Sequence, residues 1–282
     1  MPCLAEHRRD RMDRDANSFG ARLRWWRERR GLSQLALAGA AATTQRHLSF
    51  LESGRTAPSR TMVLRLGDAL TLPLRQQNTL LLAAGFAPAW RERDLAAPEL
   101  AEVNRALQFM LDQQEPYPGF VVDRRWNLLR ANAGAGRLVE FLLGPAPPPA
   151  PGAPPPNLAE ALLAPDALRP FIVNWEDTAR FFLRGVQADA AADGTAETAE
   201  LLARLLAYPG LPALYEALTP EDAKAPVLAI DFRKGATSFR LFSTIATLGT
   251  PLDVTLQEIR IECFFPADQA SAGLLRAWAA RG

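Results

Sequence analysis

The sequence has little of the chemistry that metal binding and catalysis use most. Among its 282 residues there are two cysteines, Cys3 and Cys263, and two histidines, His7 and His47. Two distant cysteines cannot form a disulfide framework or a cysteine zinc site, so a reducing, cytoplasmic environment is expected. The shortage of histidine excludes most histidine-based metal and nucleophile chemistry. We therefore expect no metal site and no required cofactor.

Long apolar runs and catalytic motifs are missing as well. No run approaches 18 uncharged apolar residues, so no membrane span is expected, and the N-terminal residues lack the apolar core of a signal peptide. The motifs GxSxG and HExxH, the Walker loop and a GxGxxG after a strand do not occur. Without a nucleophile and base that could act together, we predict that the protein is not an enzyme and has no catalytic residues.

The net charge of +1 hides an asymmetry along the chain. Residues 1–93 contain 16 arginines and 8 acidic residues, whereas residues 94–282 contain 16 basic and 23 acidic residues. A basic first third on a mildly acidic remainder indicates a module that binds a polyanion, joined to a different domain. On charge alone, a basic solvated surface without a partner is the alternative.

Residues 18–93 predict a compact domain of five short helices. The first helix, about 19–30, stops at Gly31, which is a typical residue after a helix C-terminus. Residues 1–17 are charged and show no periodicity, and we predict a disordered arm there. Residues with good N-cap side chains precede three of the later helices: Ser33, then Thr43 or Thr44, and Ser59.

Residues 94–282 predict a second domain of the α+β class. Two short apolar strands come first, helices follow over about 157–218, and three further strands come last. This order suits a five-stranded antiparallel sheet packed against helices, with strands from both ends meeting. Residues 145–156 hold eight prolines in twelve positions and predict a stiff, polyproline-like surface loop.

The last strand is expected in the run VTLQEIRIECFF. There Ile259, Ile261 and Cys263 alternate with charged residues, which predicts a strand with one face in the core.

The segment 33–54 meets the physical demands of a helix-turn-helix. Small residues at Ala38 and Ala41 allow two helices to cross closely, and leucines supply the buried contacts. The run SQ…A…ATTQRHLSFLESG resembles the helix-turn-helix of the xenobiotic-response-element and phage-repressor family. An ordinary helical bundle is the alternative.

That resemblance implies which residues contact double-stranded DNA. Glutamine can read adenine and arginine can read guanine, each through two hydrogen bonds. Gln34 matches the family's phosphate-binding glutamine and Arg55 a further backbone contact, while Arg27 and Glu52 match a partly buried ion pair with a structural role. The predicted DNA-binding residues are Gln34, Thr44, Gln45, Arg46, Ser49, Phe50 and Arg55.

Two positions depart from the family pattern. Ala42 stands in the turn where glycine is usual, so a left-handed backbone there costs about 1 kcal/mol. Phe50 replaces a polar base reader, so it either meets a thymine methyl group or packs on the protein.

Further runs fall in the order typical of one family: PLRQQNTLLLAAGF, PGFVVDRRWNLLRAN, LRPFIVNWE and FSTIATLGTPLDVTLQEIRIECFFPAD. Over about 19–278 the chain resembles the MmyB-like transcription regulators, chiefly departing at Ala42 and at the proline-rich segment. The resemblance implies a repressor-like five-helix domain followed by a PAS-like domain with a five-stranded antiparallel sheet and helices. It also implies a bacterial regulator that encloses an apolar ligand such as a fatty acid.

Aromatic residues of the second domain are candidates for an apolar pocket, although each is also a typical core residue. Asn174 and Arg180 are the polar groups expected to anchor a headgroup, with a helix cap and a solvated face as their alternatives. The predicted ligand-binding residues are Phe120, Trp126, Phe171, Asn174, Trp175, Arg180, Phe182 and Phe242.

Together these features predict a cytoplasmic, sequence-specific DNA-binding transcription regulator that forms a homodimer and binds an apolar small molecule. The alternative is a DNA-bound adaptor whose C-terminal domain serves only dimerisation or docking of another protein. An enzyme fused to a DNA-binding domain is a third hypothesis, and it requires a polar cleft with convergent titratable groups that the sequence does not offer.

Overall fold

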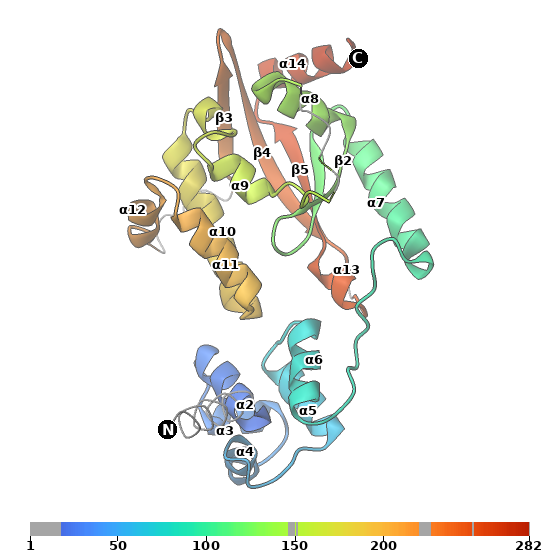
Figure 1. Ribbon diagram of the computed structural model, residues 1–282, viewed down its shortest axis with the longest axis vertical. Coiled ribbons are helices and arrows are strands. Elements are labelled where there is room, and N and C mark those ends of the chain that lie inside the picture. The colour runs from blue at the N-terminus through green and yellow to red at the C-terminus, as the bar shows by residue number, and fades with distance from the viewer. Residues whose placement is uncertain (1–17, 146–149, 151, 220–226, 250, 282) are drawn as a thin grey trace, which may run out of the picture. The chain divides into compact units, whose positions relative to one another are not determined.

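A computed structural model describes residues 18–145, 150, 152–219, 227–249 and 251–281. The chain divides into two compact units (Figure 1). The described part of the first unit is 18–92 with 252–254, and that of the second is the remainder. The predicted arm 1–17 and part of the proline-rich segment lie outside the described residues.

The first unit contains the five helices that the sequence predicts. They are α2 (Phe19–Arg29), α3 (Gln34–Ala40), α4 (Gln45–Glu52), α5 (Arg60–Ala69) and α6 (Leu74–Ala83). Four of them begin at a hydroxyl side chain that accepts a hydrogen bond from a backbone N–H three residues later. These caps are Ser18, Ser33, Thr44 and Ser59.

One apolar cluster fills the first unit and holds its helices together. A Cβ atom at Gly20 would lie 2.6 Å from the carbonyl oxygens of Leu51 and Glu52, so the glycine lets α2 approach the end of α4. The most deeply buried members of the cluster include Leu23, Leu37, Leu48, Leu51, Leu66 and Leu81.

The second unit is built on the predicted five-stranded antiparallel sheet. Its strands are β1 (Gly119–Val122), β2 (Leu128–Ala131), β3 (Ala229–Lys234), β4 (Thr237–Thr247) and β5 (Arg260–Pro266). Their order across the sheet is β2-β1-β5-β4-β3, so the strands from both ends of the domain meet where β1 pairs with β5.

Helices lie on both faces of this sheet (Figure 1). The 3-10 turn η1 (Pro98–Leu100) leads into α7 (Ala101–Gln114), which covers one face through Leu107 and Leu111. The opposite face, called the inner face below, carries the larger core. The elements packed there are α8 (Ala133–Leu143), α9 (Leu158–Leu163), η2 (Arg169–Phe171), α10 (Trp175–Asp193), α11 (Ala196–Leu206), α12 (Leu211–Glu216) and α14 (Gln269–Ala279).

Two expectations for the last strand are wrong. Residues 254–258 form a short helix, α13 (Val254–Glu258), and the strand begins at Arg260. The polar side of the strand is also covered, because Ile261 packs with the cluster under α7 while Glu262, which points to the inner face, is only 1% exposed. A sheet with helices on both faces leaves no solvent side for an alternating pattern to mark.

Candidate DNA-binding helices and ligand cavity

The turn between α3 and α4 contains a strained alanine. Ala42 has φ of 47°, in the left-handed region where a Cβ atom is unfavourable. Its carbonyl oxygen accepts a hydrogen bond from the Arg65 guanidinium at 2.6 Å, and the Thr43 N–H donates to the Ala38 carbonyl. The turn therefore has the geometry that glycine usually provides, held here by contacts from α5 and α3.

The first turn of α4 presents polar side chains to solvent. Gln45 and Arg46 are exposed, whereas Leu48 and Leu51 on the opposite side of the helix are buried. Thr44 caps the helix, because its hydroxyl accepts a hydrogen bond from the His47 N–H at 3.1 Å. A rigid helix with this polarity can place two long side chains in a DNA major groove.

Phe50 lies between two of the predicted DNA-binding arginines. The Arg46 guanidinium is 5.4 Å and the Arg55 guanidinium 5.7 Å from the centre of its ring, distances at which a cation is attracted to an aromatic face. The ring is half-buried, and Ser49 beside it is half-buried too. Phe50 thus contacts both arginines and still leaves part of its ring exposed, so both alternatives for this position stay open.

An ion pair joins α2 to the C-terminal end of α4. Arg27 donates from Nε to Glu52 Oε1 at 2.6 Å and from Nη2 to Oε2 at 3.0 Å, and the Gln34 amide donates to Oε2 at 2.9 Å. Burial by itself raises the pKa of Glu52, but the hydrogen bonds from Arg27 and Gln34 outweigh it and lower the pKa below its usual value. Gln34 keeps a second N–H with which it can meet a phosphate.

The first unit is strongly basic. Its residues 18–92 include eleven arginines against four acidic residues, and one of those four is the paired Glu52. This excess of positive charge is what a surface that binds the phosphate backbone requires.

The second unit contains an apolar cavity of about 230 Å³ between its sheet and helices α8 and α9. Every lining side chain is apolar except that of Asn157, and most come from the inner face of the sheet and the two helices. The lining residues are Phe120, Leu128, Leu138, Val139, Leu143, Pro156, Asn157, Leu158, Ala161, Leu162, Leu168, Phe232 and Phe264.

Three of the predicted ligand-binding aromatic residues belong to the core around this cavity. Phe120 lines it directly. Trp126 and Phe182 are buried in the same core, with their rings edge to face at 5.6 Å. Trp126 has φ of 65°, an uncommon conformation for a bulky residue, and its indole N–H donates to Asp189 at 3.3 Å.

The two expected headgroup anchors are engaged elsewhere. Asn174 fastens α10 to the edge strand β3, because its amide donates to the Ala229 carbonyl at 2.7 Å and its oxygen accepts from the Asp231 N–H at 2.8 Å. Arg180 pairs with Glu176 and Asp177 on its own helix. Neither residue lines the apolar cavity, and the expected role for them there finds no geometric support.

Phe171 and Trp175 are half-buried residues packed against the edge of the inner core. The Arg169 guanidinium lies 4.1 Å from the Trp175 ring centre, and the Lys234 ammonium lies 5.7 Å from that of Phe171. They cover the core at its border rather than line the cavity.

Phe242 is on the wrong face of the sheet for the predicted role. It pairs with Phe265 across β4 and β5, and the two rings stack at 5.5 Å. The neighbouring Phe264 faces the cavity instead. Successive strand residues point to opposite faces, and the run FSTIAT does not alternate regularly between apolar and polar residues, so the sequence does not reveal which face Phe242 takes.

Several residues that line the cavity are not among the predicted ligand-binding residues, because that prediction considered aromatic and polar side chains only. Leu138, Leu158 and Leu162 are aliphatic positions on helical faces that any core would use. Nothing in the sequence distinguishes these positions from ordinary core residues.

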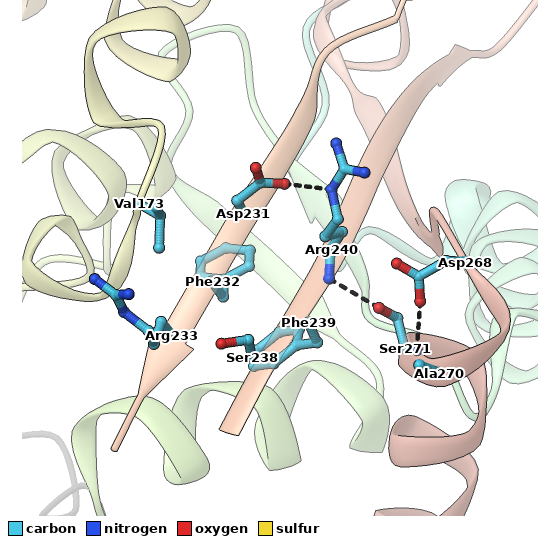
Figure 2. A pocket seen from close by; sticks show the side chains of 10 residues that line it. All are labelled: Val173, Asp231, Phe232, Arg233, Ser238, Phe239, Arg240, Asp268, Ala270 and Ser271. Atoms are coloured by element: carbon cyan, nitrogen blue, oxygen red, sulfur yellow. Dashed lines mark hydrogen bonds and ion pairs between the residues drawn. The ribbon is translucent and has the colours of Figure 1, made fainter. Parts of the chain in front are cut away.

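A second hollow, of about 320 Å³, lies beside the β3–β4 hairpin and the start of α14 (Figure 2). Three of its charged groups have partners in the structure: Arg240 donates from Nε to Asp231 at 2.6 Å, and Asp268 accepts from the Ser271 N–H as the cap of α14. The Ser271 hydroxyl in turn accepts from the Arg240 backbone N–H at 2.9 Å. The contacts of Ser271 and Asp268 hold the start of α14 against β4.

Within the described residues, no helix combines the length and the apolar character needed to cross a membrane. The same residues contain no group of three or more histidine, cysteine, aspartate or glutamate side chains placed to hold a metal ion.

A basic helix-turn-helix unit joined to an α+β unit with an apolar cavity defines a DNA-binding transcription regulator with a ligand-binding domain. Comparison with protein families agrees. The family described as Helix-turn-helix domain matches residues 18–80, and the family described as MmyB-like transcription regulator ligand binding domain matches residues 103–277. The second match covers more than half of the chain, which therefore belongs to the MmyB-like transcription regulators. None of the curated proteins compared with the chain matches it.

Proposed function

We propose that this regulator binds a specific DNA sequence as a homodimer in the cytoplasm, and that its second, PAS-like domain controls this binding through an apolar small molecule. The carrying observation is the first turn of α4, where Gln45 and Arg46 are exposed on a helix whose other side is buried. Membership of the family supports both the DNA-binding and the ligand-binding part.

The homodimer follows from the size of the DNA-binding unit. One helix-turn-helix reads a single half-site, and proteins of this kind gain affinity by placing two such units about one helical turn of DNA apart. We therefore propose an operator with two-fold symmetry. Since the positive charge of residues 18–92 provides much of the binding, affinity should fall steeply as salt is raised.

The apolar cavity on the inner face of the sheet is the proposed ligand site. A cavity lined by aliphatic and aromatic side chains favours a hydrocarbon chain or ring over a sugar or nucleotide. A fatty acid is our first candidate, because the sequence resembles a family in which such a ligand is expected. A ligand that binds one dimer geometry better than another shifts the population, and with it the affinity for the operator.

Selection from random duplex DNA with the full chain tests the DNA-binding part. We expect enrichment of a two-fold symmetric sequence with the wild-type protein and none with the Gln45→Ala, Arg46→Ala double variant. Enrichment of the same sequence by the double variant would show that α4 does not read bases.

Native mass spectrometry of the purified chain tests the ligand. A retained apolar molecule, lost on substitution of Leu162 by tryptophan to fill the cavity, supports a sensor. Leu162 is a suitable position because it lines the cavity from α9 and is only 2% exposed.

An adaptor remains the second candidate, and two features favour it. Phe109 on α7 is 68% exposed, and the stacked pair Phe242 and Phe265 lies on the sheet face away from the cavity. Such aromatic side chains suit contact with another protein or a second copy. A chain that dimerises but carries no small molecule, and whose Leu162→Trp variant binds DNA unchanged, would favour the adaptor.

A further inference from the structure

Glu262 is a buried carboxyl group with an unused hydrogen-bonding atom. It lies in β5, between β1 and β4, and is 1% exposed. The Ser243 hydroxyl donates a hydrogen bond to the carboxyl group, but Oε2 is the one buried side-chain oxygen or nitrogen of the described residues that has no partner. A buried polar atom without a partner destabilises the fold, so its retention calls for a reason.

The position of Glu262 connects it to the apolar cavity. Phe120 lies directly opposite it in the β1–β5 ladder, and Phe264 follows two residues later on the same face of β5. Both phenylalanines line the cavity, with their rings edge to face at 5.7 Å. Glu262 is therefore on the same face of the sheet as the cavity and adjacent to two of its lining residues, although Glu262 itself does not line the cavity.

No cation in the part of the chain that the structure describes donates a hydrogen bond to Oε2 of this carboxyl group. The nearest along the strand, Arg260, uses both of its terminal nitrogens on Asp189, at 2.5 and 2.6 Å. Burial in this environment raises the pKa of Glu262 to about 7, and the Ser243 hydrogen bond and Arg260 only partly oppose it. Glu262 Oε2 therefore has no hydrogen-bond donor among the described residues.

We propose that Glu262 is the polar anchor of the ligand, and that the ligand carries a hydrogen-bond donor, an amine or a hydroxyl group, on an apolar body. The proposal rests on the proposed function, in which the cavity of the second domain binds an apolar molecule. A fatty acid meets the apolar requirement, but its carboxylate would face a second carboxyl group and can share the site only by holding a proton between them. An amine or alcohol of the same length supplies the missing donor directly.

Three probes with the same octyl chain test the polar end: octylamine, 1-octanol and octanoate. Calorimetric titration of the full chain at pH 8 measures the affinity of each. We expect octylamine or 1-octanol to bind about tenfold more tightly than octanoate, which is the size of effect that one hydrogen bond to a charged group produces. Octanoate that binds as tightly as both donors overturns the proposal.

The variant Glu262→Gln separates the carboxylate from the shape of the side chain. Because a glutamine amide can donate to octanoate, we expect the preference for the donor probe to disappear or reverse. Glu140→Gln is the matched control, since Glu140 is an exposed residue of α8, and it should leave all three affinities unchanged. An unchanged donor preference in Glu262→Gln overturns the proposal.

The Leu162→Trp variant separates this proposal from the proposed function. If all three probes bind equally and the variant abolishes binding, the cavity takes apolar ligands and only the role of Glu262 is wrong. If no probe binds the wild-type chain, both are wrong.

A measurement on the wild type alone covers the case in which Glu262→Gln does not fold. The affinity for octylamine should rise as pH rises through about 7. The other charged groups near this carboxyl, Arg260 and Asp189, are paired with each other, and the Cys263 thiol has its pKa raised by burial. An octylamine affinity that does not change between pH 6 and pH 8 counts against the anchor.

Discussion

Arg27 and Glu52 are joined by two hydrogen bonds that tie α2 to the last turn of α4. The carboxylate side chain is fully buried, and the guanidinium is 11% exposed. The exposed first turn of α4, with Gln45 and Arg46, is therefore the free end of a helix whose other end is held in the core. Such an arrangement fixes the direction in which the predicted base-reading side chains project.

Removing one member of this pair should be strongly destabilising. Glu52→Leu leaves the mostly buried Arg27 without its main partner, and we expect the free energy of unfolding to fall by about 3–5 kcal/mol. Urea denaturation measures the change. The double variant Arg27→Met, Glu52→Leu should recover most of the loss, because no buried charge then lacks a partner. Equal loss in the single and double variants would show that the leucine itself, and not the unpaired charge, is responsible.

Substituting the strained alanine should stabilise the DNA-binding unit. Ala42→Gly removes a Cβ atom from a residue with φ of 47°, and we expect a gain of about 1 kcal/mol in urea denaturation. Ala36→Gly is the matched control, because Ala36 is exposed within α3, where glycine costs about 1 kcal/mol. The two substitutions are chemically identical, so opposite signs identify the backbone conformation as the cause. A loss of stability in both would contradict it.

Arg46 and Arg55 both contact Phe50 but are assigned different roles on DNA. Arg46→Ala should reduce affinity for the selected sequence by about 1–3 kcal/mol and relax the base preference at one position. Arg55→Ala should weaken binding to all sequences alike and reduce the slope of log affinity against log salt by about one. Titrations of specific and scrambled duplexes at several salt concentrations distinguish the two. The assignment fails if Arg55→Ala alters base preference while Arg46→Ala does not.

The sequence predicts local features of this protein better than those that depend on neighbours distant in the chain. Helix starts at Ser33 and Ser59 follow from cap chemistry within three residues and could be placed, while the start at Thr44 could be placed to within one residue, between Thr43 and Thr44. The faces of Phe242 and Phe264 depend on strand register, which is set by pairing between β4 and β5. A run that does not alternate regularly between apolar and polar residues carries no information about that register.

Glu262 illustrates the same limit at the candidate ligand site. Its alternation with Ile261 and Cys263 indicates an exposed polar face. That interpretation holds for a sheet with one face in water, but not for this sheet, which helices cover on both faces. Burial of Glu262 arises from helices that pack on the inner face from other parts of the chain. Residue type alone predicts Asn174 as a ligand anchor. In the structure its side-chain amide is hydrogen-bonded to the backbone of β3, and this contact depends on tertiary packing that residue type does not reveal.

Glu262 should also make stability depend on pH. Its pKa is raised from 4.5 to about 7 on folding, so between these values the folded chain retains a proton that the unfolded chain has lost. The stabilisation is complete below pH 4.5 and is lost as pH rises to about 7, which amounts to about 3 kcal/mol. Urea denaturation of wild type and Glu262→Gln at pH 5 and pH 8 measures the difference. The variant should gain stability relative to wild type at pH 8, and an equal difference at both pH values would contradict the burial of a titrating group.

The most direct test of this account compares specific with non-specific DNA binding by the full chain. Fluorescence anisotropy with the selected duplex and a scrambled duplex should show a large affinity ratio for wild type. We predict that the Gln45→Ala, Arg46→Ala variant loses most of that ratio and keeps its salt-dependent binding to both duplexes, because the remaining arginines still meet phosphates. A double variant that still prefers the selected duplex by the wild-type ratio would contradict the assignment of α4 as the helix that reads DNA.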